Sequence, residues 1–98
     1  MGFADSYDFE LLKNEAEQIV LHELERQLDA YTEELCLCNE CVVDMAAIAL
    51  NTVKPLYRFS LLGALYTAQA MNEKDYADSV RQAVAKAIEK VRKNPSHD

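Results

Sequence analysis

The sequence has few residues that interrupt a helix and no pattern that performs catalysis. Its 98 residues include only two Gly and two Pro, and half of them are hydrophobic. This composition argues against a disordered chain and against a loop-rich β protein. The sequence has no Gly-rich phosphate loop, no His-Glu-x-x-His motif, and no Ser or Cys beside a His at a catalytic spacing. We therefore predict a single, mainly α-helical domain over residues 1–98 that is not an enzyme.

Long apolar runs and a secretion signal are also lacking. The apolar stretch from Met45 to Val53 is far short of the roughly 20 residues that a membrane-spanning helix needs, and the longest uncharged stretch, residues 59–72, also falls short of it. No signal-peptide pattern is present, and an odd number of cysteines is typical of a reducing compartment. The sequence predicts a cytoplasmic protein without a membrane span.

Positive charge is scarce in the first half of the chain. The net charge is −7, which disfavours binding to polymeric nucleic acid. Residues 1–50 carry 12 acidic and 2 basic side chains, a net of −10, whereas residues 51–98 carry 5 acidic and 8 basic ones, a net of +3. A small anion or an acidic partner surface would therefore bind the second half, and two copies could pair acidic segment with basic tail. A solvated distribution of charge without a partner is the alternative.

Apolar residues at helical spacing predict a long N-terminal helix. The stripe has a period of about 3.7 residues, that of an ordinary amphipathic helix. A helix over residues 9–35 would be roughly 40 Å long, which exceeds the diameter of about 35 Å expected for a compact domain of this size. Either the helix breaks or a second chain covers its stripe, and we expect a homodimer through Leu24 and Leu28. The stripe consists of Phe9, Leu12, Ala16, Val20, Leu24, Leu28, Tyr31 and Leu35.

The remaining chain predicts a buried central helix and an amphipathic C-terminal helix. Residues 42–53 are apolar nearly all round, apart from Asp44 and Asn51, which would share a face and either bond neighbouring backbone or, for Asp44, support a metal site. Pro55 ends this helix, and a short hairpin or bend is expected near 56–67, with residues 61–71 alternatively helical. Asn72 resembles a cap for the last helix. Its stripe is Tyr76, Val80, Val84, Ala87, Ile88 and Val91, followed in the last turn by Lys90, Arg92 and Lys93.

All three cysteines lie within six residues, at positions 36, 38 and 41. A C-x-C-x-x-C run that enters a helix points three sulfurs at one place, and converging thiolates suit zinc. Reduced structural thiols are the alternative interpretation, and a redox role is a third. Three ligands are one short of a closed structural zinc site, so the metal hypothesis requires a fourth.

The cysteine run and the motifs that follow it resemble the ComFB family of late-competence proteins. The matching pattern is C-x-C-x-x-C-x-x-D at residues 36–44, A-L-N at 49–51 and P-x-Y at 55–57, and the likeness covers most of residues 14–97. The resemblance implies a small cytoplasmic helical homodimer without a catalytic centre, connected with competence, type IV pili or motility. It also implies cysteine-bound zinc and, for some members, a cyclic dinucleotide ligand of the c-di-GMP type.

Two groups of candidate site residues follow. The resemblance implies that the fourth zinc ligand comes from the C-terminal part, as in some members of the family. This chain has no fourth cysteine, and His97 is the candidate rather than His22 on the polar face of the first helix, with a carboxylate or water as alternatives. The candidate nucleotide-binding residues are Tyr57, Arg58, Ser60, Arg92 and Lys93. They supply cations for phosphates, a ring for stacking and a hydroxyl donor. The competing function is a constitutive interaction module that binds an unidentified protein partner without a nucleotide.

Overall fold

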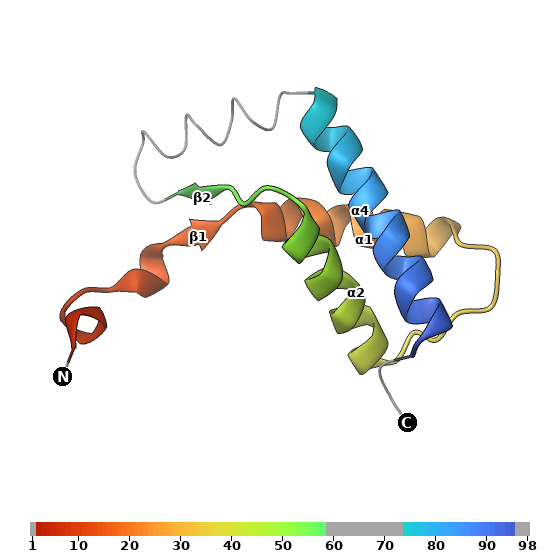
Figure 1. The fold of residues 1–98 in the computed structure, drawn as a ribbon, viewed down its shortest axis with the longest axis horizontal. Helices are drawn as coiled ribbons and strands as arrows, with labels where there is room; N and C mark the ends of the chain where they lie inside the picture. The colour runs from red at the N-terminus through yellow and green to blue at the C-terminus, as the bar shows by residue number, and fades with distance from the viewer. Residues whose placement is uncertain (1, 59–73, 96–98) are drawn as a thin grey trace.

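A computed structural model describes residues 2–58 and 74–95, where three α-helices pack around one apolar core (Figure 1). Two short 3-10 helices and one strand precede the first α-helix, and a second strand follows the second α-helix. The expected mainly α-helical fold is confirmed. The elements are η1 (Phe3–Ser6), η2 (Phe9–Leu11), β1 (Lys13–Asn14), α1 (Ala16–Ala30), α2 (Asn39–Thr52), β2 (Tyr57–Arg58) and α4 (Lys74–Lys93).

Helix α4 supplies the largest part of the core. Every member of its predicted apolar stripe is buried, and it packs against both α2 and α1. Met45 of α2, Val20 of α1 and Ile88 of α4 are among the largest fully buried side chains. The basic last turn with Arg92 and Lys93 is present as predicted. A 3.6-residue periodicity thus located this helix correctly from sequence.

Helix α1 is much shorter than the 9–35 helix that the sequence predicted. Asn14 interrupts the chain before it: its Oδ1 accepts hydrogen bonds from the backbone N–H of Ala16, at 3.2 Å, and of Leu56, at 2.8 Å. At the other end, Tyr31 is extended, with φ −71° and ψ 130°. Continuing the helix would place the carboxylates of Glu33 and Glu34 at its C-terminus, where the helix dipole disfavours negative charge. The helix therefore breaks at both ends.

The predicted dimer face through Leu24 is wrong. Leu24 is only 3% exposed because α2 and α4 of the same chain cover it. Leu28 and Tyr31 are partly buried and pack against the same core. Phe9, at the start of the predicted stripe, is instead about half exposed. Within the described residues, the apolar stripe of the first helix packs against the rest of its own chain, except at the N-terminal end of the stripe.

The two strands form a small antiparallel sheet. Lys13 pairs with Arg58 and Asn14 pairs with Tyr57. A short strand is therefore present at the start of the region expected to form a hairpin or bend, and its partner is β1, 40-odd residues earlier. The rest of the expected 56–67 hairpin or bend, the alternative helix at 61–71 and the Asn72 cap lie outside the described residues.

Helix α2 is less buried than its composition predicted. Cys41, Met45 and Ala49 are buried, whereas Val43 is 57% exposed and Asp44 is also exposed. The face of α2 that carries Cys41, Met45 and Ala49 therefore packs against the core, and the face that carries Val43 and Asp44 is exposed. The Asn51 side chain donates from Nδ2 to the carbonyl of Ala47 at 3.0 Å, the local backbone bond that was one of the two predicted roles.

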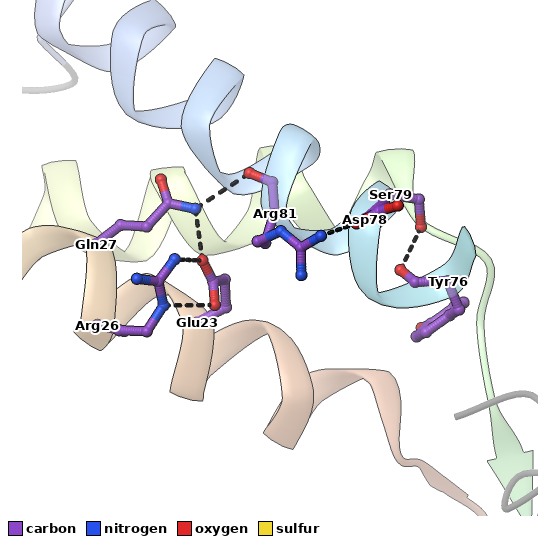
Figure 2. A network of polar contacts seen from close by, with 7 residues as sticks. All are labelled: Glu23, Arg26, Gln27, Tyr76, Asp78, Ser79 and Arg81. Carbon is purple, nitrogen blue, oxygen red and sulfur yellow. Dashed lines mark hydrogen bonds and ion pairs between the residues drawn. The ribbon is translucent and has the colours of Figure 1, made fainter. Parts of the chain in front are cut away.

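A polar network joins α1 to α4 at the edge of the core (Figure 2). The Glu23 carboxylate accepts hydrogen bonds from Arg26, at 2.6 and 2.9 Å, and from Gln27, at 2.7 Å. Gln27 also donates to the carbonyl of Arg81 in α4, at 3.1 Å, and Arg81 forms an ion pair with Asp78. These bonds fix the relative position of the two helices along one side.

None of the helices in the described part of the chain is long and apolar enough to cross a membrane.

Candidate metal centre

The three cysteines lie where the segment after α1 enters α2. Cys38 is the N-cap of α2, with φ −70° and ψ 162°, and its carbonyl accepts from the backbone N–H of Val42 at 3.0 Å. Its Sγ accepts from the N–H of Cys41 at 3.5 Å. Cys36 precedes the cap and Cys41 follows it by three residues, so the first turn of the helix gathers all three side chains on one side.

The predicted convergence of the sulfurs is confirmed. The three Sγ atoms all lie within 4.8 Å of one another. Tetrahedral zinc with bonds near 2.3 Å requires sulfurs about 3.8 Å apart, so a shift of about 1 Å at most is needed. Cys41 is completely buried, while Cys36 and Cys38 are half-buried. The donor set and its geometry fit a zinc ion with one coordination position supplied from elsewhere.

The thiols of Cys36 and Cys38 differ in pKa. The backbone N–H of Cys38 lowers the pKa of Cys36, and the Cys38 thiol adds to this effect. For Cys38 itself, the N–H of Cys41 lowers the pKa, but burial and hydrogen bonds with Cys36, Cys41 and Glu40 outweigh it and raise the pKa to about 11. Cys36 therefore ionises before Cys38. A metal that binds all three must displace the proton of Cys38, so binding releases protons.

The C-terminal end of α4 lies against the cysteine segment. A pocket of about 350 Å³ is lined on one side by Glu34, Leu35 and Cys36, and on the other by Val91, Arg92 and Pro95. The described chain thus passes beside Cys36 at Pro95. His97, the predicted fourth ligand, is two residues further along and lies outside the described residues.

A second polar network ties the cysteine segment to α4. The hydroxyl of Tyr31 donates to Glu89 Oε2 at 2.6 Å. Arg92 bridges Glu89, at 3.3 Å, and Glu33, at 3.0 Å. The hydrogen bond with Tyr31 lowers the pKa of Glu89, and the same bond raises the pKa of Tyr31. We call Tyr31, Glu33, Glu89 and Arg92 the clamp.

Sequence reasoning missed the clamp because its members were assigned other roles. Tyr31 was counted in the apolar stripe of the first helix, and Glu33 was one of many acidic residues. Tyr31 and Glu89 are separated by 58 positions. The one available signal was a tyrosine at the end of an aliphatic stripe, because a buried stripe that ends in a hydroxyl often finds a polar partner.

The structure separates the predicted nucleotide-binding residues into two places. Arg92 and Lys93 end α4, beside the cysteines, whereas Tyr57 and Arg58 form β2. In Figure 1 these two segments lie at opposite ends of the molecule. Tyr57 is 55% exposed. Ser60 lies outside the described residues. A single protomer therefore does not bring the candidate residues together.

These features define a small helical domain with a three-thiol centre at a helix junction, held against the end of its last helix. Comparison with known sequences places the chain within one family. The family model described as late competence development protein ComFB matches residues 13–95, and the chain belongs to this family. The predicted resemblance is confirmed.

One solved structure gives independent support. The late competence protein ComFB from Bacillus subtilis superposes with a TM-score of 0.66 at 27% sequence identity. The match covers 87% of this chain and 94% of that one. The two proteins therefore share their architecture over most of this chain. Among curated proteins, none matches this chain.

Proposed function

We propose that this chain is a non-enzymatic regulatory protein of the cytoplasm that binds a cyclic dinucleotide of the c-di-GMP type. It acts as a homodimer of single-domain subunits and carries a structural zinc. The observation that carries the proposal is the position of Arg92, which lines one pocket together with Cys36 of the family motif. Membership of the ComFB family supports a role in competence, type IV pili or motility.

In this proposal zinc is held by Cys36, Cys38, Cys41 and His97. The pocket beside Cys36 includes Pro95, and two further residues reach up to about 7 Å, enough for the imidazole of His97 to approach the sulfurs. Zinc so bound supplies a cross-link and no reaction. It would fasten the start of α2 to the tail beyond α4, close to the clamp, which joins the segment after α1 to α4.

The ligand chemistry rests on charge and stacking. A cyclic dinucleotide carries two phosphates and two purines, so its site needs cations and flat groups. Arg92 offers a guanidinium that exchanges Glu33 and Glu89 for phosphate oxygens, and Lys93 adds a second positive charge. Tyr57 offers an exposed ring, with Arg58 and Ser60 beside it in sequence. Because these two groups lie at opposite ends of one protomer, the ligand would bridge two protomers related by a two-fold axis.

A specific observation favours the alternative of a constitutive interaction module. The guanidinium of Arg92 already contacts two carboxylates, those of Glu33 and Glu89. An arginine so neutralised attracts a phosphate less strongly than an unpaired one. In this second function the end of α4 binds a protein partner, and no nucleotide is involved.

Calorimetric titration with c-di-GMP separates the two functions. We expect binding at micromolar or lower concentration, weakened by added salt because ion pairs with phosphate are screened. Arg92→Ala and Arg58→Ala should each weaken binding about tenfold, the loss typical of one charged hydrogen-bonded contact. Arg81→Ala is the matched control, because Arg81 is an exposed arginine of the same helix that pairs with Asp78. Absence of heat with any cyclic dinucleotide, on folded wild-type protein, would leave the interaction module.

A further inference from the structure

The first residues of the chain form an acidic, aromatic arm. This N-terminal arm, residues 2–12, precedes the part of the chain that the family model matches. It contains five of the nine large hydrophobic residues that are exposed in the described residues, with Phe3 at 72%. The five are Phe3, Tyr7, Phe9, Leu11 and Leu12.

Residues of the N-terminal arm contact one another, but their large hydrophobic side chains are largely exposed. The ring of Phe3 packs at a tilt against those of Tyr7 and Phe9, with centroids 4.9 and 5.7 Å apart. Asp8 caps η2 by accepting from the N–H of Glu10 at 3.1 Å. Asp5, Asp8 and Glu10 give the arm a charge of −3 with no basic residue. An exposed cluster of rings beside carboxylates is typical of a binding segment rather than of a free surface.

A surface of opposite charge lies on α4. Lys86, Lys90 and Lys93 follow one another at helical spacing on its exposed side, and with Ala85 and Glu89 they line a pocket of about 390 Å³. We call these five residues the lysine face. No ion pair within residues 2–58 and 74–95 engages any of its three lysines. Lysine stems offer apolar contact to rings, and their ammonium groups attract both ring faces and carboxylates.

We propose that the N-terminal arm of one copy docks on the lysine face of a second copy, and that the exchange is reciprocal. The arm does not reach the lysine face of its own chain: in Figure 1 it leaves the helices at one end of the molecule, and the lysine-bearing end of α4 lies at the other. The longest dimension is 46 Å. A two-fold axis perpendicular to this longest dimension places the N-terminal arm of each copy on the lysine face of the other. Both contacts then form together, and the dimer has no unfilled arm or lysine face at which a third copy could add.

This arrangement rests on the homodimer of the proposed function and gives the second copy a role in the site. The arm continues directly into β1, which pairs with β2 and hence with Tyr57. Docking the arm near Lys90 of the second copy therefore brings Tyr57 of one protomer toward Arg92 of the other. The two separated groups of candidate nucleotide residues become neighbours only in this dimer.

Charge reversal tests the docking directly. One variant, Asp5→Lys with Glu10→Lys, makes the arm basic and retains the cap residue Asp8. The other, Lys86→Glu with Lys90→Glu, makes the lysine face acidic and retains Arg92 and Lys93. In sedimentation velocity, each variant alone should dimerise at least about tenfold more weakly than wild type, because like charges then meet at both contacts. An equimolar mixture should regain wild-type dimerisation, because both contacts in the mixed dimer again join opposite charges.

The other outcomes are equally informative. Dimerisation that is unchanged in both single variants, or a mixture that stays as weak as its components, would overturn the proposal. Recovery only when both pairs of substitutions occupy one chain, and not in the mixture, would indicate an arm that folds back on its own α4 and would also overturn it. Lys74→Glu, an exposed lysine of α4 outside the lysine face, should leave dimerisation unchanged. Circular dichroism confirms that each variant is folded.

The same proteins distinguish this proposal from the nucleotide proposal. None of these substitutions removes a proposed nucleotide-binding residue. Binding of c-di-GMP by a wild-type dimer that is insensitive to both charge reversals would refute the arm contact and leave the ligand proposal standing. If the mixture of the two charge-reversal variants regains wild-type dimerisation but no protein binds c-di-GMP, the arm contact stands and the ligand proposal is refuted.

Discussion

Replacing Cys36 by Ser tests the metal centre with little disturbance of the core. Cys36 is half-buried, whereas Cys41, in the first turn of α2, is completely buried in the core. A substitution at Cys41 would change core packing whether or not zinc binds, so its effect could not be assigned to the metal. At Cys36 a hydroxyl replaces a thiol of nearly the same size in a partly solvated place, and the chief loss is one thiolate ligand.

The expected magnitude follows from linkage between binding and unfolding. Zinc at 100 times its Kd stabilises the folded state by about 2.7 kcal/mol. For a domain of this length, 1 kcal/mol corresponds to a change in Tm of about 4–8 °C. A chelator should therefore lower the Tm of the wild type by roughly 10–20 °C. In Cys36→Ser the same chelator should lower Tm by a few degrees at most, because a site with one thiolate fewer binds zinc far more weakly.

Thermal unfolding followed by circular dichroism, with and without chelator, measures both shifts. Leu37→Ser is the matched control: Leu37 lies between two of the cysteines, is exposed, and offers no metal ligand. Its chelator shift should equal that of the wild type. The reasoning is refuted if the chelator leaves the wild type unchanged, or if it lowers the Tm of Cys36→Ser as much as that of the control.

Three further predictions concern the scaffold. Asn14→Ala should lower the free energy of unfolding by about 1–3 kcal/mol, because the backbone N–H of Leu56 loses its acceptor, whereas the exposed Asn94→Ala should cost about 0.5 kcal/mol or less in the same urea titrations. Leu24→Ala should cost about 2–5 kcal/mol by chemical denaturation; near-neutral behaviour would contradict its burial within one chain. The hydrogen bond from Arg26 lowers the pKa of Glu23 below its usual 4.5, so Glu23 contributes stability above that pH and loses it as the pH falls through the lowered value. Glu23→Gln should consequently flatten the acid decline of unfolding free energy below about pH 4.5, and an unchanged slope would count against the network of Figure 2.

The sequence by itself determined those features that depend on near neighbours along the chain. The buried stripe of α4 was predicted residue by residue, from Tyr76 to Val91, because a helix places positions three and four apart on the same face. The gathering of the three thiols was predicted for the same reason, since Cys38 and Cys41 span one helical turn. The mainly helical class followed from the lack of Gly and Pro, and the family followed from motifs at fixed spacing.

Only the tertiary structure decided where α1 begins and ends. The apolar period continues from Phe9 through Leu35 without interruption, yet the helix occupies only Ala16–Ala30. Its start depends on Asn14, which binds the backbone of Leu56, 42 positions away. Its end coincides with Tyr31, whose hydroxyl binds Glu89. No local pattern encodes such partners, because the competing interactions form only once the chain has folded.

The tertiary structure also decided what the candidate site residues are near. Arg92 was grouped with Tyr57 and Arg58 as a candidate ligand residue because all three lie in the basic half of the chain. The fold instead places Arg92 beside Cys36 and pairs it with Glu33. Composition and charge specify which residue types are available in each half. Distances between segments arise from helix packing, which involves the whole core at once, so they are set by the fold and not by the local sequence.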